Sequence, residues 1–182
     1  MRLLLHICCA PCTIYPLQAL RGRGDEVTGF FYNPNIQPLL EFRRRMDTLE
    51  DYARQTDVPV LWHRNYGLAR FLREVVFREQ DRCRICYFLR LSRTAQLAVS
   101  EGFEGFTTTL LYSRFQNHEL VRTIGKQLAK EHRIPFVYMD FREGWREGIA
   151  ASRKIGLYRQ PYCGCVYSEA ERYGSIGALK EQ

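Results

Sequence analysis

Short apolar runs alternate with segments of helical periodicity along this chain, and this alternation restricts the fold more than any other feature. Each run is five to seven residues long, which is the length of a buried strand. Parallel strands joined by crossover helices produce such a pattern. We therefore expect an α/β fold with a Rossmann-like, mostly parallel sheet flanked by helices. The expected strands are Leu3–Cys8, Glu26–Tyr32, Val58–His63, Phe106–Tyr112 and Pro135–Met139.

Apolar residues at turn spacing predict helices between these strands. No linker, shift in composition, internal repeat or low-complexity tract divides the 182 residues. We therefore expect one α/β domain over residues 1–182. The expected helices are residues 11–20, Pro38–Gln55, Leu68–Phe77, Cys83–Ser100, residues 118–132, Trp145–Ile155 and a short one at Ser168–Arg172.

The chain has seven cysteines, and none of them is isolated. They form the groups Cys8-Cys9-x-x-Cys12, Cys83-x-x-Cys86 and Cys163-x-Cys165. Their number is odd and too small for a disulfide scaffold. The first group follows the first expected strand, and open parallel sheets bind ligands beyond the carboxyl ends of their strands. We expect the three groups to converge at that edge.

Three kinds of chemistry fit thiols at these spacings. The two C-x-x-C pairs could bind one structural zinc, but this leaves Cys8, Cys163 and Cys165 without a role. A C-x-x-C at a helix N-terminus could be a redox dithiol, because its thiol pKa values are lowered. An iron–sulfur cluster uses four thiolates, and the other three then bind something else. The spacing favours metal binding, and seven thiols suit four plus three better than four alone.

Basic residues exceed acidic residues by 27 to 20, which gives a net charge of +7. The excess is arginine, which forms bidentate bonds to phosphate and stacks on bases. Charge alone leaves two interpretations open, namely solvated helix faces or a nucleic-acid substrate. We expect the run Arg43–Arg45 to be a solvated helix face and His118 to lie on a helix surface.

No run of 18 or more apolar residues is present, so the sequence predicts no transmembrane helix. The apolar stretch at the N-terminus is too short for a signal peptide. We expect a soluble, cytoplasmic protein with no membrane partner.

Motifs of one known family occur in order along nearly the whole chain. The segments are His6–Cys12, Tyr32–Ile36 with Glu41 and Arg45, Arg82–Tyr87 with Arg90 and Leu91, Phe106–Leu111, Gln116–Asn117 and Tyr158–Cys165. Together they resemble the QueH-type epoxyqueuosine reductases. Arg114 departs from the family pattern, which has proline there, and this affects only a local loop.

The resemblance implies a fold similar to the adenine-nucleotide α-hydrolase-like proteins, also called the HUP type. It implies a catalytic domain that removes the epoxide oxygen of epoxyqueuosine at the wobble position of tRNA, giving queuosine. This deoxygenation takes two electrons and two protons, so an external electron donor is needed. Family members use a [4Fe–4S] cluster beside a second iron ion, without cobalamin.

The resemblance also implies roles for individual residues. The cluster ligands would be Cys8, Cys9, Cys83 and Cys86. The second iron would take Cys12, Cys163 and Cys165. Apart from the resemblance, we expect Tyr158, Tyr162 or Glu41 to supply a proton, and the sequence does not choose among them. Cys8 and Cys9 can share a cluster only where the strand has already turned, because adjacent strand residues point to opposite faces. Two rival classes remain, a zinc-stapled RNA-binding module without catalysis and a thiol oxidoreductase.

Overall fold

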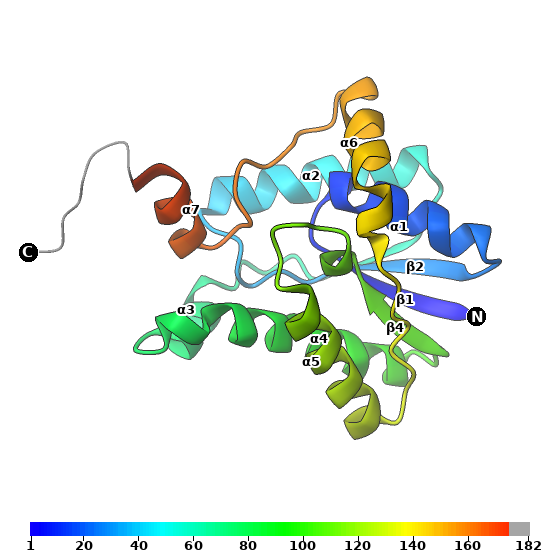
Figure 1. The fold of residues 1–182 in the computed structure, drawn as a ribbon, viewed down its shortest axis with the longest axis horizontal. Helices are drawn as coiled ribbons and strands as arrows, with labels where there is room; N and C mark the ends of the chain where they lie inside the picture. Colours follow the sequence, from blue (N-terminus) through cyan, green and yellow to red (C-terminus); the bar gives the residue numbers. More distant parts are fainter. Residues whose placement is uncertain (175–182) are drawn as a thin grey trace, which may run out of the picture.

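A parallel sheet of four strands lies at the centre of the computed structural model, which describes residues 1–174 (Figure 1). The strands are β1 (Arg2–Ile7), β2 (Glu26–Phe31), β3 (Val60–Trp62) and β4 (Gly105–Thr108), in the order β3-β2-β1-β4. All pairings are parallel, which confirms the predicted α/β class. Residues 175–182, the end of the expected domain, lie outside the described residues.

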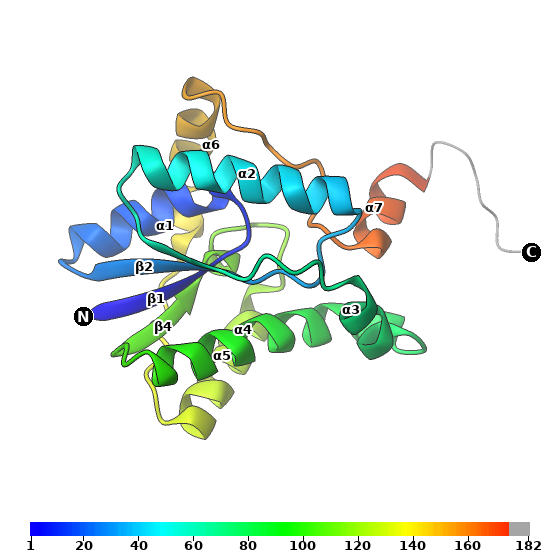
Figure 2. The same cartoon turned by 180° about the vertical axis from the view of Figure 1, so that it is seen from behind.

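Helices cover both faces of the sheet, as the front and rear views show (Figures 1 and 2). α1 and α2 lie on one face with α6 packed on α1, and α4 covers β1 and β4 on the other face with α5 packed on α4. The α-helices are α1 (Ala10–Gly22), α2 (Leu39–Gln55), α3 (Leu68–Val75), α4 (Arg82–Ser100), α5 (His118–His132), α6 (Trp145–Lys154) and α7 (Val166–Tyr173). Short 3₁₀ turns are η1 (Glu79–Asp81), η2 (Thr109–Leu111) and η3 (Phe141–Gly144).

β1 is the central strand and is apolar on both faces, because helices cover both. Leu3, Leu4, Leu5 and Ile7 are fully buried. Each such side chain contributes about 1.5–3 kcal/mol by leaving water. The continuous apolar run that predicted the first strand therefore reflects its central position.

The expected fifth strand, Pro135–Met139, is absent within the described residues. Phe136 forms only an isolated bridge with Phe106, flanked by hydrogen bonds at Pro135 and Val137. Proline has no N–H to donate to a ladder, and the chain turns away into η3. The fourth strand is also shorter than expected, because the Thr108 hydroxyl accepts from the Leu110 N–H and starts a 3₁₀ turn.

His118 is buried, which contradicts the expected surface position. Its Nε2 lies 3.1 Å from the Tyr138 hydroxyl, and the two rings meet edge to face. Tyr138 belongs to the segment that sequence reasoning placed in a fifth strand. Because that segment leaves the sheet, its tyrosine covers the start of α5.

The strand order fixes where a ligand site can form. The chain builds β1, β2 and β3 outward on one side, and then returns to place β4 on the other side of β1. The connections after β1 and β4 therefore leave the sheet towards opposite faces, and such sheets bind ligands at the carboxyl ends of the strands at this point. Within residues 1–174, no helix combines the length and the hydrophobicity needed to cross a membrane.

Candidate metal centre

All three cysteine groups lie at helix N-termini. Cys9 is the N-cap of α1, Cys83 and Cys86 lie at the start of α4, and Cys165 is the N-cap of α7. A helix N-terminus carries about half a positive charge and favours thiolate over thiol. The three groups thus share a position at the start of a helix, although burial opposes ionisation of Cys83 and Cys86.

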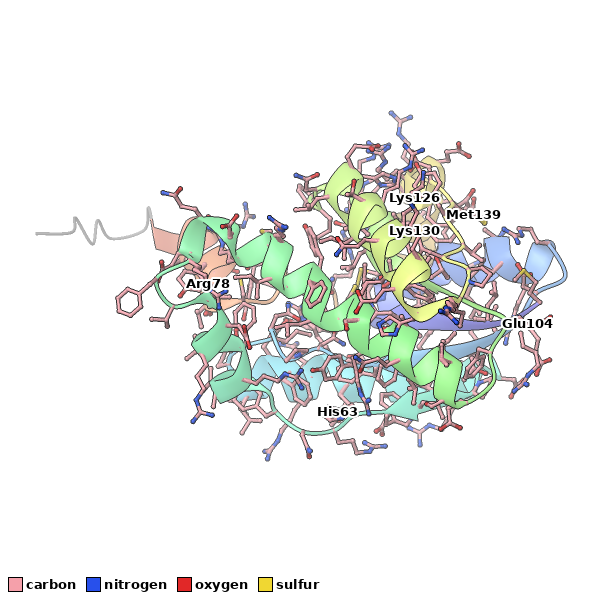
Figure 3. The ribbon with its side chains drawn as sticks, turned by 90° about the horizontal axis from the view of Figure 1, so that it is seen from below. His63, Arg78, Glu104, Lys126, Lys130 and Met139 are labelled. Atoms are coloured by element: carbon pink, nitrogen blue, oxygen red, sulfur yellow. A yellow bond between two sulfur atoms is a disulfide. The ribbon has the colours of Figure 1, made fainter. Side chains whose placement is uncertain are left out.

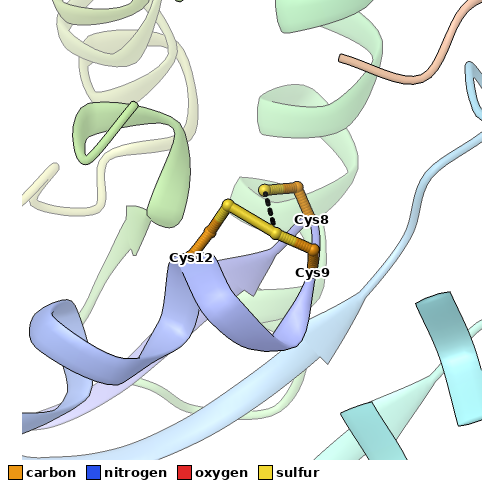
Figure 4. Close-up of side chains that lie close together, drawn as sticks. All are labelled: Cys8, Cys9 and Cys12. Atoms are coloured by element: carbon orange, nitrogen blue, oxygen red, sulfur yellow. Dashed lines mark hydrogen bonds between the residues drawn. A yellow bond between two sulfur atoms is a disulfide. The ribbon is translucent and has the colours of Figure 1, made fainter. Parts of the chain in front are cut away.

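The first group is compact (Figure 4). The sulfur atoms of Cys8, Cys9 and Cys12 lie within 4.8 Å of one another, so they can contact one metal ion. β1 ends at Ile7, and the Cys8 and Cys9 sulfurs are only 3.8 Å apart. The turn required for adjacent cysteines to point the same way is therefore present. Cys9 and Cys12 are joined as a disulfide, with Cα atoms 5.4 Å apart.

Two polar side chains contact the sulfurs of this group. The Thr109 hydroxyl accepts from the Cys8 N–H at 3.1 Å and donates to the Cys8 sulfur at 3.3 Å. The Gln160 amide donates to the Cys9 sulfur at 2.9 Å and to the Cys12 sulfur at 3.5 Å. Because Thr109 directly follows β4, the group lies at the carboxyl ends of β1 and β4. Sequence reasoning assigned neither residue a role, although both lie in the resembling segments.

The other two groups pack against each other. Cys86 and Cys165 are buried in one small apolar cluster with Phe71, Val75 and Leu89. Burial raises the pKa of the Cys86 thiol to about 12. The interaction between the two thiols lowers the pKa of Cys163 and raises that of Cys165. Cys163 and Cys165 therefore lie close enough to influence each other's ionisation.

Arg90 is a buried cation beside these thiols. It is 3% exposed, and its Nη2 lies 3.0 Å from the Cys86 sulfur while its Nε donates to the Cys86 carbonyl oxygen. Its charge also acts on Cys8 and Cys163. Among residues 1–174 no carboxylate pairs with it. A buried guanidinium requires an anion, and thiolates are the groups at hand. The donor set therefore fits a thiolate-bound metal.

Arg45 is also buried, which corrects the expectation that Arg43–Arg45 is a solvated face. It is 2% exposed, and its Nε donates to Glu41 Oε1 at 2.6 Å, one helical turn away. Its two terminal nitrogens donate to the carbonyl oxygens of Cys163 at 2.9 Å and Tyr162 at 3.0 Å. Arg45 thus holds the third cysteine group against the start of α2.

Gly164 lies where the third cysteine group packs most closely against Arg45 and Ile36. Its φ of +136° belongs to a region that favours glycine, and a Cβ there would lie 3.1 Å from both Arg45 Nη1 and Ile36 Cγ1. The Gly164 carbonyl accepts from the Gln37 N–H at 2.8 Å. The glycine between the two cysteines is therefore required by close packing.

The three residues expected to supply a proton lie where the third cysteine group contacts the start of α2. The Tyr158 hydroxyl donates to Glu41 Oε2 at 2.6 Å, and burial raises its pKa to about 12. The Tyr162 hydroxyl donates to the Gln37 carbonyl oxygen at 2.6 Å. Glu41 and Tyr162 also line a surface pocket of about 270 Å³, together with Pro38, Leu40, Arg44, Glu169 and Tyr173.

Comparison with known proteins gives one consistent result. The family model described as epoxyqueuosine reductase QueH matches residues 3–171. Epoxyqueuosine reductase QueH of Dehalococcoides mccartyi is 36% identical over 173 residues, covering 95% of each chain. The protein of the same name from Thermotoga maritima is 35% identical, covering 93% of this chain and 91% of its own. That from Streptococcus pyogenes is 33% identical, covering 91% and 69%. The chain therefore belongs to the QueH family of epoxyqueuosine reductases, and it is an oxidoreductase.

Proposed function

We propose that this protein reduces epoxyqueuosine at the wobble position of tRNA to queuosine. The epoxide oxygen leaves as water, and two electrons from an external donor and two protons are consumed. No cobalamin takes part. The observation that carries the proposal is the group of three cysteine sulfurs at the carboxyl end of β1, with Arg90 buried against Cys86 and acting on Cys8 and Cys163. We take residues 1–182 to be a single catalytic domain that acts in the cytoplasm. Family membership removes the non-catalytic zinc module from consideration.

The thiols are proposed to bind a [4Fe–4S] cluster and a second iron ion. Such groups supply one-electron transfer and Lewis acidity when bound. The proposed cluster ligands are Cys8, Cys9, Cys83 and Cys86, and the proposed ligands of the second iron are Cys12, Cys163 and Cys165. Two features support a pair of anionic sites close together. The charge of Arg90 interacts with one thiol of each group, namely Cys8, Cys86 and Cys163. The Gln160 amide donates to one sulfur of each proposed set, Cys9 and Cys12.

Tyr158 and Glu41 are the favoured source of a proton. Tyr158 is protonated at neutral pH, as an ordinary tyrosine is, and its hydroxyl donates to the Glu41 carboxylate. After Tyr158 has given its proton away, the phenolate takes a proton from water, because the Glu41 carboxylate that accepts its hydrogen bond carries none. Tyr162 is the third candidate, but its hydroxyl is bound to a backbone carbonyl and so has a structural use.

The test is conversion of an RNA that carries epoxyqueuosine, with a chemical reductant and no cobalamin. Wild-type protein is expected to form queuosine. Tyr158→Phe is expected to lower kcat about 100-fold, a typical contribution of a general acid. Tyr162→Phe is the matched control and should change kcat far less. No conversion by iron-loaded wild-type protein contradicts the function, and full activity of Tyr158→Phe contradicts only the proton donor.

Cys12→Ser tests how the thiols divide. We expect this variant to keep the visible absorbance of the cluster and to lose one iron, because Cys12 is proposed to bind only the second iron. Cys83→Ser, in the other set, should lose the visible absorbance. Iron and acid-labile sulfide are measured on anaerobically purified protein. Loss of the whole cluster in Cys12→Ser would show that Cys8, Cys9 and Cys12 act as one set, as their close spacing also permits.

The Cys9–Cys12 disulfide favours one alternative, a thiol oxidoreductase. A dithiol of that kind works without iron, so metal analysis separates the two functions. Iron and sulfide that are required for conversion support the cluster. Iron-free protein that still converts the substrate would support the dithiol.

A further inference from the structure

The segment between η2 and α5 exposes an aromatic ring beside the metal centre. Phe115 is 84% exposed. Its segment follows Thr109, whose hydroxyl contacts Cys8, so it leaves the sheet at the same edge as the thiols. A single exposed phenylalanine is common on protein surfaces, so the neighbours of this ring decide whether it marks a binding site.

Both ends of this segment are fixed. The buried Tyr112 donates its hydroxyl proton to the Trp145 carbonyl oxygen at 3.2 Å. At the other end, the Tyr87 hydroxyl donates to Gln116 Oε1 at 2.8 Å and accepts from the Asn117 N–H at 3.1 Å. Tyr87 directly follows Cys86. The ring of Phe115 is thus presented on a loop anchored to the residues around the metal centre, and less entropy is lost when it binds.

The neighbours of Phe115 are aromatic and cationic. Its ring meets Trp145 edge to face with centroids 5.7 Å apart, and the Arg114 guanidinium lies 5.9 Å from the same indole. The charges of Arg114 and Arg159 both act on Tyr112 beneath the loop. An open aromatic face next to arginines is the arrangement that binds single-stranded nucleic acid, since bases stack on rings and phosphates pair with guanidinium groups.

We propose that Phe115 is a stacking platform for an unpaired base of the RNA substrate, with Arg114 and Arg159 contacting the phosphates beside it. The proposal rests on the proposed function, because it names the surface by which that substrate is held. The paired part of the RNA makes no stacking contact with this ring, since its bases are stacked on one another. The platform therefore distinguishes a single-stranded loop from a duplex.

A second exposed phenylalanine provides a matched control. Phe77 is 94% exposed and lies next to Arg78, in the turn between α3 and η1 that Figure 3 shows at the end of the molecule far from Glu104. Its N–H is bonded to Glu79, and Glu74 and Asp81 are close in the chain. Because Arg78 is paired with Glu74, its charge is already compensated, and we do not expect this ring to bind RNA.

The experiment measures binding of an RNA hairpin with a single-stranded loop and of a fully paired duplex of the same length. Phe115→Ala is expected to weaken hairpin binding about 10- to 100-fold, the effect of losing one stacked base. Phe115→Tyr should restore wild-type affinity, because its ring also stacks. Phe77→Ala should bind as wild type, and none of the variants should alter duplex binding.

Two outcomes overturn the platform. One is wild-type hairpin affinity in Phe115→Ala, and the other is an equal loss on hairpin and duplex. Iron content of each variant shows that the fold is intact. The hairpin used for binding carries no epoxyqueuosine. The binding experiment therefore tests the platform independently of the proposed reaction. Hairpin binding that depends on Phe115, without conversion of epoxyqueuosine RNA, would contradict the reaction alone.

Discussion

Replacing Arg45 with methionine is expected to destabilise the protein by about 3–5 kcal/mol, the usual cost of removing one partner of a buried ion pair. The Glu41 carboxylate, 9% exposed, would lose its cation, and the carbonyl oxygens of Tyr162 and Cys163 would lose their donors. The measurement is urea unfolding of anaerobic protein. Arg45→Met should also lose iron from the set that includes Cys163 before the visible absorbance of the cluster falls.

Two variants separate these effects from a general loss of charge. Arg43→Met removes an exposed guanidinium from the same helix and should change the free energy of unfolding by less than about 0.5 kcal/mol. The double variant Glu41→Gln with Arg45→Met removes both charges and should recover part of the stability. Equal losses in Arg43→Met and Arg45→Met would refute the role of Arg45. Loss of stability without loss of iron would show that Arg45 stabilises the fold but does not position the third cysteine group.

Most of the fold could be predicted because its signals are local. The run Leu3–Cys8 is apolar apart from His6, since β1 is covered on both faces, and α2 shows its buried side at helical spacing. The fifth strand could not be predicted correctly from the same kind of signal. Pro135 and the turn into η3 end the pairing after one bridge, and nothing in the apolar run itself shows this.

The parts of the site that depend on residues close together in the sequence could be predicted. The parts that depend on contacts between residues far apart in the sequence could not. Clustered cysteines at expected helix starts indicated a metal centre at the edge of the sheet. Arg45 is separated from Cys163 by 118 positions, and Gln160 from Cys9 by 151. No periodicity relates such pairs, so a run of three arginines looked like a solvated face. Arg90, four residues after Cys86, had a local signal, because that spacing places both side chains on one helix face.

Arg90→Met is expected to lower the reduction potential of the proposed cluster by on the order of 100 mV. A buried positive charge stabilises the reduced state, which carries one more electron. At about 6 Å and an effective dielectric constant of about 20, two unit charges interact by about 3 kcal/mol, which corresponds to roughly that potential for one electron. The measurement is a redox titration followed by electron paramagnetic resonance. Arg90→Lys keeps the charge and should retain most of the potential.

The free energy of unfolding of Arg90→Met, measured with and without iron, shows whether Arg90 acts through its charge or through packing. In protein without iron, thiols such as Cys86 are protonated, so Arg90 is a buried cation without a full counter-charge. Its replacement by an apolar side chain of similar length should then raise the free energy of unfolding. With thiolate-bound iron, the same change removes the counter-charge and should speed iron loss. Arg93→Met, an exposed neighbour on α4, should show neither effect. A loss of stability in both states, with the potential unchanged, would show that Arg90 acts only through packing.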